Sequence, residues 1–164
     1  MCRMSNKLVS KWRKLISYAS KSGATEQAAK IVADVLKDKH GLEVELVNLR
    51  KESADLAQYH NVVVGAGVRA GKVYSEALGF LKQDFGDRKL AFFVCCDAGG
   101  DPNKREEACS KYITKVLADY PNLKAVATEA FGGRMKMLGK TLFDNIDPDK
   151  IRAWAETLGS KLAE

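Results

Sequence analysis

The chain has 164 residues, of which 46% are hydrophobic and 29% are charged, a composition that excludes a disordered or fibrous protein. This length suits one compact domain, which we expect at residues 12–164 behind a flexible extension at residues 1–11. No apolar run reaches the roughly 20 residues of a membrane span, and the extension lacks the apolar segment of a secretory signal, so we expect a cytoplasmic protein with no integral membrane segment. The net charge of +6 comes from basic residues scattered among acidic ones, which argues against a nucleic-acid partner and leaves a peripheral membrane contact open.

Short apolar runs alternate with amphipathic stretches along the whole chain. Strands are expected at 14–19, 43–49, 61–66, 90–95 and 125–131, where apolar or alternating residues lie between turn signals. Helices are expected from residue 25 to Gly41, at 74–85, from Asp101 to Pro121, and from Asp147 to the last residues. The stretch between Phe131 and Ile146 is expected to be irregular. This alternation predicts an α/β fold with a parallel, doubly wound sheet.

The segment from Ser20 to Thr25 joins the first strand to the first helix. It carries three hydroxyl side chains and Gly23 at the expected helix N-terminus, where free N–H groups and the helix dipole favour an anion. Ser and Thr are also ordinary helix caps. Two interpretations therefore stay open at this point, a phosphate site and a simple cap.

Two further segments follow neighbouring strands of the expected sheet, at 65–72 and 96–101. Both are rich in small residues that allow a ligand to approach backbone N–H groups. Ligands of doubly wound sheets bind beyond the carboxyl ends of the strands. We therefore expect these two segments and Ser20–Thr25 to form one ligand site.

Several other chemistries lack their motifs. The chain has no Gly-Lys-Ser/Thr triplet of a nucleotide-hydrolysing loop and no Gly-x-Ser-x-Gly elbow. The run from Gly65 to Ala70 fits G-x-G-x-x-A, but it follows the third strand, so we interpret its glycines as a requirement of the loop. His40 and His60 stand alone and are expected to be solvent-exposed loop residues.

The four cysteines contain no Cys-x-x-Cys pair, so we expect neither a disulfide framework nor a metal site. Cys96 has two interpretations. It either packs in the interior or faces the ligand at the end of the fourth strand.

From about residue 14 onward the chain resembles the flavodoxin superfamily. Ser20–Thr25 is similar to the T-x-T-G-x-T phosphate loop of that family. Residues 65–72 are similar to the second flavin loop of the branch that includes flavodoxin-type protoporphyrinogen dehydrogenases, and residues 131–134 are similar to a segment of the same proteins. The resemblance implies a flavodoxin-like three-layer sandwich, with a five-stranded parallel sheet in the order 2-1-3-4-5 and helices on both faces.

The resemblance also implies FMN as the cofactor. The residues that would hold its phosphate are Ser20, Lys21, Ser22, Gly23, Ala24 and Thr25. Those that would flank its ring are Gly67, Val68, Arg69, Ala70, Gly71 and Lys72 on one side, and Cys96, Asp97, Ala98, Gly99 and Gly100 on the other. The expected contacts of a substrate or partner are Tyr74, Arg134 and Lys136. Neither ring segment contains an aromatic residue, and the two cations in the first of them predict a less negative reduction potential than that of acidic flavodoxins.

Three functions follow as hypotheses. The first is an FMN-binding protein that carries electrons between redox partners. The second is an enzyme of the protoporphyrinogen-dehydrogenase type acting on a small anionic substrate. The third is a module with the same fold that binds partners without flavin, a hypothesis that the missing aromatic residues favour.

Overall fold

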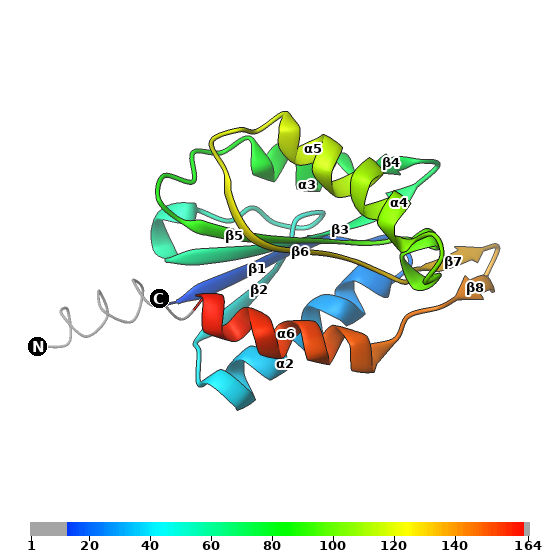
Figure 1. The fold of residues 1–164 in the computed structure, drawn as a ribbon, viewed down its shortest axis with the longest axis horizontal. Coiled ribbons are helices and arrows are strands. Elements are labelled where there is room, and N and C mark those ends of the chain that lie inside the picture. The colour runs from blue at the N-terminus through cyan, green and yellow to red at the C-terminus, as the bar shows by residue number, and fades with distance from the viewer. Residues whose placement is uncertain (1–12, 163–164) are drawn as a thin grey trace, which may run out of the picture.

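The computed structural model describes residues 13–162 and shows a parallel sheet between two layers of helices (Figure 1). The extension expected at residues 1–11 lies outside the described residues. The main parallel strands stand in the order β2-β1-β3-β5-β6, which confirms the expected order 2-1-3-4-5 of successive parallel strands. These strands are β1 (Lys14–Ala19), β2 (Val44–Asn48), β3 (Asn61–Arg69), β5 (Lys89–Cys95) and β6 (Lys124–Phe131).

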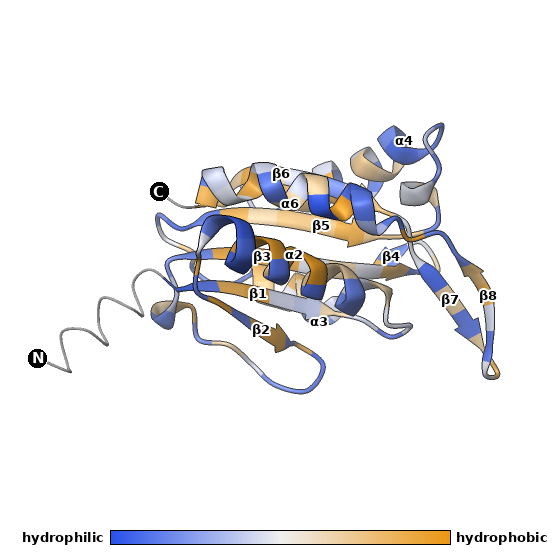
Figure 2. Cartoon of the chain, turned by 90° about the horizontal axis from the view of Figure 1, so that it is seen from below, coloured by the Kyte–Doolittle hydropathy of each residue, from blue (hydrophilic) through white to orange (hydrophobic). Residues whose placement is uncertain are grey.

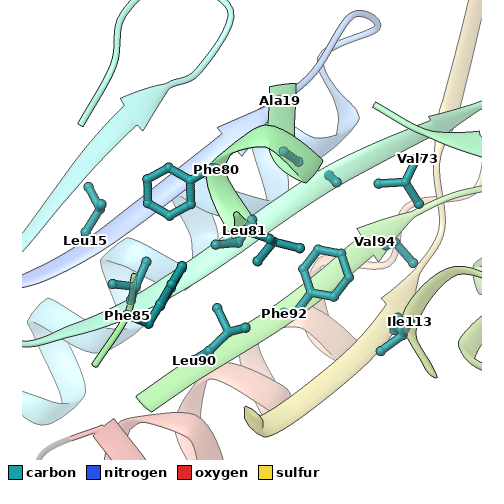
Figure 3. Packing of buried hydrophobic residues seen from close by; sticks show 14 of the residues in the cluster. Leu15, Ala19, Val73, Phe80, Leu81, Phe85, Leu90, Phe92, Val94 and Ile113 are labelled. Atoms are coloured by element: carbon teal, nitrogen blue, oxygen red, sulfur yellow. The ribbon is translucent and has the colours of Figure 1, made fainter. Parts of the chain in front are cut away.

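Both faces of the sheet are apolar because side chains alternate between them along each strand. In β5, Leu90, Phe92 and Val94 enter one buried cluster, shown in Figure 3, whereas Ala91 and Phe93 enter the cluster on the other face. Each fully buried Leu or Phe side chain contributes about 1.5–3 kcal/mol. The continuous apolar runs of the sequence thus correspond to strands covered on both sides.

Helices pack on the two faces of the sheet in separate layers. One layer consists of α2 (Ala24–His40) and α6 (Pro148–Leu162), which share a buried cluster with Ile16 and Phe93. The other layer consists of α3 (Ser75–Leu81) and a continuous helix formed by α4 (Arg105–Cys109), the π-helical segment η3 (Ser110–Thr114) and α5 (Lys115–Ala118). Figure 1 shows these layers below and above the sheet. A short 3-10 helix, η1 (Leu56–Gln58), precedes β3.

The sequence did not predict the first of two β-hairpins at the carboxyl end of the sheet. The strand expected at 61–66 continues to Arg69 and pairs antiparallel with β4 (Lys72–Val73). Ala70 and Gly71 form the turn with φ values of 53° and 75°. Two successive positive φ values are typical of a type I′ turn, in which Asn-Gly is the strongest sequence signal. Because Ala occupies the first turn position, the pattern gave no such signal.

The second hairpin lies in the stretch expected to be irregular. It consists of β7 (Arg134–Met137) and β8 (Lys140–Asp144), with Leu138 and Gly139 at φ values of 52° and 78° in the turn. Figures 1 and 2 show that β4 and the β7–β8 hairpin lie at the same end of the molecule.

Helix ends differ from the sequence predictions in two places. The helix expected at 74–85 ends at Leu81, and the helix expected from Asp101 begins at Arg105. The delay at Asp101 has a local cause, because its carboxylate accepts a hydrogen bond from the Asn103 N–H (2.9 Å) and forms a turn. The expected ends at Gly41 and Asp147 are confirmed by a left-handed Gly41 cap and by the Asp147 carboxylate, which accepts from the Asp149 N–H.

The interpretation of His40 as a solvent-exposed loop residue is wrong. His40 is the last residue of α2, and its Nε2 lies 2.9 Å from the Glu156 carbonyl oxygen in α6. A Cβ placed on Gly159 would lie 2.1 Å from the imidazole ring. The ring therefore packs between the two helices at a position that only glycine leaves open.

Candidate functional site

The expected convergence of three segments at the carboxyl end of the sheet rests on strand register. Ala19 is paired with Ala66, and Gly67 is paired with Cys95, so β1, β3 and β5 end side by side. The segments that follow them therefore meet at one edge. Side chains and backbone from the first two segments, together with Cys95, line one small cavity there.

The loop from Ser20 to Thr25 leaves the N-terminus of α2 open. The Ser20 Oγ accepts a hydrogen bond from the Gly23 N–H (3.1 Å), and Gly23 has a φ of 87°, which favours glycine. No side chain caps α2, whose first internal bond runs from the Gln27 N–H to the Gly23 carbonyl. The interpretation of the hydroxyls as a simple helix cap is therefore wrong. The first N–H groups of α2 keep their capacity to bind an anion.

The cavity at this loop is small, and long side chains line it. Its volume is about 20 Å³, which is roughly room for one water molecule. Tyr74 lies against Gly67, since a Cβ placed on Gly67 would be 2.8 Å from the Tyr74 ring. The Lys21 Nζ lies 5.1 Å from the centre of that ring. A phosphate can enter only if Lys21, Tyr74 or Arg134, all of which line the cavity, moves aside.

The second segment, residues 67–72, is a hairpin with an exposed tip rather than the expected loop. Gly67 is buried, Val68 is half-buried, and Arg69 to Lys72 are exposed. Burial raises the pKa of Tyr74, whereas the charges of Arg69 and Arg50 lower it. Both guanidinium groups therefore act electrostatically on the mouth of the cavity.

The third segment, residues 96–100, is a tight turn held against β6. Its 3-10 helix η2 (Ala98–Gly100) brings Gly99 against the strand, where an added Cβ would lie 2.2 Å from the Phe131 carbonyl oxygen. Asp97 and Gly100 are exposed, whereas Cys96 is buried in the cluster beneath α3 and α4. Burial raises the pKa of the Cys96 thiol, which favours the packing interpretation of this residue.

Three residues that the sequence prediction missed position groups around the site. The Arg50 guanidinium donates to the Ser20 carbonyl oxygen (3.3 Å) and pairs with Glu76 (3.5 Å). The Asn145 amide donates to the carbonyl and carboxylate of Asp97 (2.9 and 3.0 Å) and accepts from the Gly133 N–H. Gln27 accepts a hydrogen bond from Arg134. None of the three lies in a recognisable motif, so the sequence carried no signal for them.

The residues expected to contact a substrate or partner lie in different surroundings. Tyr74 and Arg134 line the cavity at the phosphate-type loop. Lys136 is exposed on β7, close in sequence to the exposed apolar side chains Met137, Leu138 and Leu142.

Two classes of site receive no support within residues 13–162. No group of three or more His, Cys, Asp or Glu side chains there is arranged to hold a metal ion. No helix of this part of the chain is long and apolar enough to cross a membrane.

A family model described as a flavodoxin domain matches residues 15–153. The chain belongs to the flavodoxin-domain family. No curated protein sequence matches it significantly. The match spans all three segments of the site and the whole β7–β8 hairpin.

Solved flavodoxin structures have the same fold as this flavodoxin-domain chain. The flavodoxin of Streptococcus pneumoniae TIGR4 superimposes with a TM-score of 0.62 at 18% identity, over 92% of this chain and 97% of that one. A short-chain flavodoxin associated with a bacterial microcompartment gives 0.61 at 17% identity, over 93% and 99%. The Flv1 flavodiiron core of Synechocystis sp. PCC6803 gives 0.65 at 15% identity, over 98% of this chain and 37% of that one.

Proposed function

We propose that this chain is a single flavodoxin domain that binds FMN and carries electrons between redox partners. The observation that carries the proposal is the uncapped N-terminus of α2 behind a loop with three hydroxyl side chains. It lies at the carboxyl end of a sheet that belongs to a flavodoxin domain. The family makes a flavin the expected cofactor, and the donor set makes FMN the form that fits best.

The residues of the loop fit a phosphate group. N–H groups at the start of α2, the Ser22 and Thr25 hydroxyls and the helix dipole all favour a dianion. In this proposal Ser20 to Thr25 hold the phosphate, while residues 67–72 and 96–100 lie on either side of the ring. The bound flavin supplies the redox chemistry, and the protein binds and orients it and sets its potential.

Exposed groups around the site support a macromolecular redox partner. The β7–β8 hairpin carries Met137, Leu138 and Leu142 with exposed fractions of 53%, 97% and 55%. Lys136 and Lys140 are exposed beside them, and Arg69 and Lys72 are exposed on the other hairpin. An acidic partner with an apolar centre would complement this edge, and the expected location of such a protein is the cytoplasm.

The same exposed cations favour a second candidate function, a flavoenzyme of the protoporphyrinogen-dehydrogenase type. Arg69, Lys72 and Lys136 provide three unburied positive charges for a small anionic substrate. The small volume of the cavity favours the third candidate, a partner-binding module without flavin.

Flavin titration tests the proposal. We expect the purified protein to bind added FMN and to quench its fluorescence, and Ser22→Ala to weaken this binding by about 3- to 10-fold through loss of one hydroxyl donor. Ser110→Ala is the matched control, because it removes an exposed hydroxyl from the π-helical segment. A protein that leaves FMN fluorescence unchanged refutes both redox functions. If FMN binds, turnover of protoporphyrinogen with a quinone acceptor distinguishes the enzyme from the electron carrier.

A further inference from the structure

Arg134 reaches the phosphate-type loop from a distant part of the chain. It is the first residue of β7, and its guanidinium lies at the N-terminal turn of α2. The Arg134 Nη2 donates to the Gln27 Oε1 (2.6 Å), and its Nε donates to the Asp144 Oδ2 (2.8 Å). With a side-chain exposure of 18%, it is the least exposed of the arginines that form ion pairs in the described chain.

A cation at this position needs anionic groups nearby, and Asp144 and Glu26, which lies in the first turn of α2, supply two of them. The N-terminus of a helix carries a partial positive charge, and basic side chains are stabilising at the opposite end. Asp144 neutralises one edge of the guanidinium, but Lys21 lines the same cavity and adds another positive charge. Two cationic side chains and a helix N-terminus thus lie around one small space, and a phosphate dianion bound there would interact favourably with all three.

One donor group of Arg134, Nη1, lies beside the backbone of the phosphate-type loop. Within residues 13–162, the Nη1 group donates no hydrogen bond, while Nε and Nη2 are held by their two acceptors. A Cβ placed on Gly23 would lie 3.4 Å from Nη1, so this nitrogen lies directly beside the backbone of the loop. Asp144 and Gln27 therefore hold the guanidinium in place and leave its Nη1 edge for a ligand.

We infer that Arg134 is a phosphate ligand that makes the site selective for FMN over riboflavin. This inference rests on the proposed flavin site and adds to it a residue from outside the three segments. Because the contact is to the phosphate alone, loss of Arg134 weakens binding of the phosphorylated flavin and leaves the affinity for riboflavin unchanged. The contact of Arg134 with the phosphate would also link the phosphate to the base of the β7–β8 hairpin.

The test compares two flavins and two arginine variants. We expect Arg134→Ala to weaken FMN binding by about 10- to 100-fold, the range of a hydrogen bond to a charged group, and to change riboflavin binding by less than about 3-fold. Arg152→Ala is the matched control, because Arg152 lines the groove on the outer side of Arg134 but pairs with Asp149 and does not line the cavity. It is expected to change neither affinity.

A second variant separates phosphate binding from anchoring of the hairpin. Asp144→Asn removes the ion pair but keeps the guanidinium, so most of the FMN affinity is expected to remain. Equal losses for FMN and riboflavin in Arg134→Ala, or equal effects of Arg134→Ala and Arg152→Ala, would overturn the inference.

A parallel measurement with inorganic phosphate distinguishes failure of the inference from failure of the proposed function. Phosphate is expected to raise the thermal unfolding midpoint of the wild type and of Arg152→Ala, compared with chloride at equal ionic strength, but not that of Arg134→Ala. If the wild type binds no flavin, the proposed function fails. In that case a phosphate effect that depends on Arg134 still supports the site, and the lack of such an effect overturns it.

Discussion

Replacement of Gly65 by alanine is expected to destabilise the protein because a Cβ at this position has no room. Gly65 lies in the middle of the sheet between Tyr18 and Phe93. An added Cβ would lie 2.3 Å from the Phe93 Cζ and 2.7 Å from its Cε2. Ordinary contacts begin near 3.4 Å, so the ring would have to shift by about 1 Å.

The Phe93 ring cannot make this shift freely. It is fully buried, and its centre lies 5.7 Å from the centre of the Phe131 ring and 5.9 Å from that of the Trp154 ring. Overpacking of a core costs about 1–3 kcal/mol. Alanine also restricts the conformations of the unfolded chain, which offsets about 0.4–1 kcal/mol of this destabilisation. We expect Gly65→Ala to lower the free energy of unfolding by about 1–2 kcal/mol.

Gly79→Ala is the control with the opposite sign. Gly79 lies inside α3, and a Cβ there meets nothing within 4 Å. Alanine at this position is expected to raise the free energy of unfolding by about 0.5–1 kcal/mol through its helix propensity. Urea unfolding of both variants measures the two effects. A Gly65→Ala protein as stable as the wild type would refute the packing argument, whereas partial rescue by Phe93→Leu would support it.

Three other changes have expected outcomes. Leu138→Asn is expected to stabilise the protein by about 1 kcal/mol, because Leu138 is 97% exposed and has a φ of 52°, which asparagine adopts more readily in a turn before glycine. A urea midpoint at or below that of the wild type would contradict this. Burial and the hydrogen bond to Glu45 raise the pKa of Tyr59 from 10.0 to about 12, so the stabilisation that this residue provides is complete below pH 10 and is lost as the pH rises to 12. Tyr59→Phe is expected to reduce the decrease in unfolding free energy between pH 10 and pH 12. An unchanged decrease would contradict this role of Tyr59. If FMN binds, Arg69→Ala is expected to make its reduction potential more negative in a redox titration, and an equal or more positive potential would reject that role for the exposed Arg69 charge.

Local patterns in the sequence predicted the strands, and the family resemblance implied their order, but neither predicted the two hairpins. The β3–β4 and β7–β8 turns contain Ala70 and Leu138 at positive φ, where sequence rules expect Asn or Gly. Alternation was also weak, because the β7–β8 strands are exposed on most of their length and bury no apolar face. The sequence patterns place Gly65 both in the third strand and at the start of the loop that follows it, whereas the structure places it within β3, where it accommodates the Phe93 ring.

The sequence by itself determined the parallel sheet, its two helical layers and the loop from Ser20 to Thr25, since these depend on periodicity and on neighbouring residues. Only the tertiary structure decided that α2 has no side-chain cap and that Arg134 lies at its N-terminus beside Gly23. The Arg134–Gln27 hydrogen bond joins residues 107 positions apart. Such a contact depends on the path of the chain after β6 and on the turn at Leu138, and no local pattern records it.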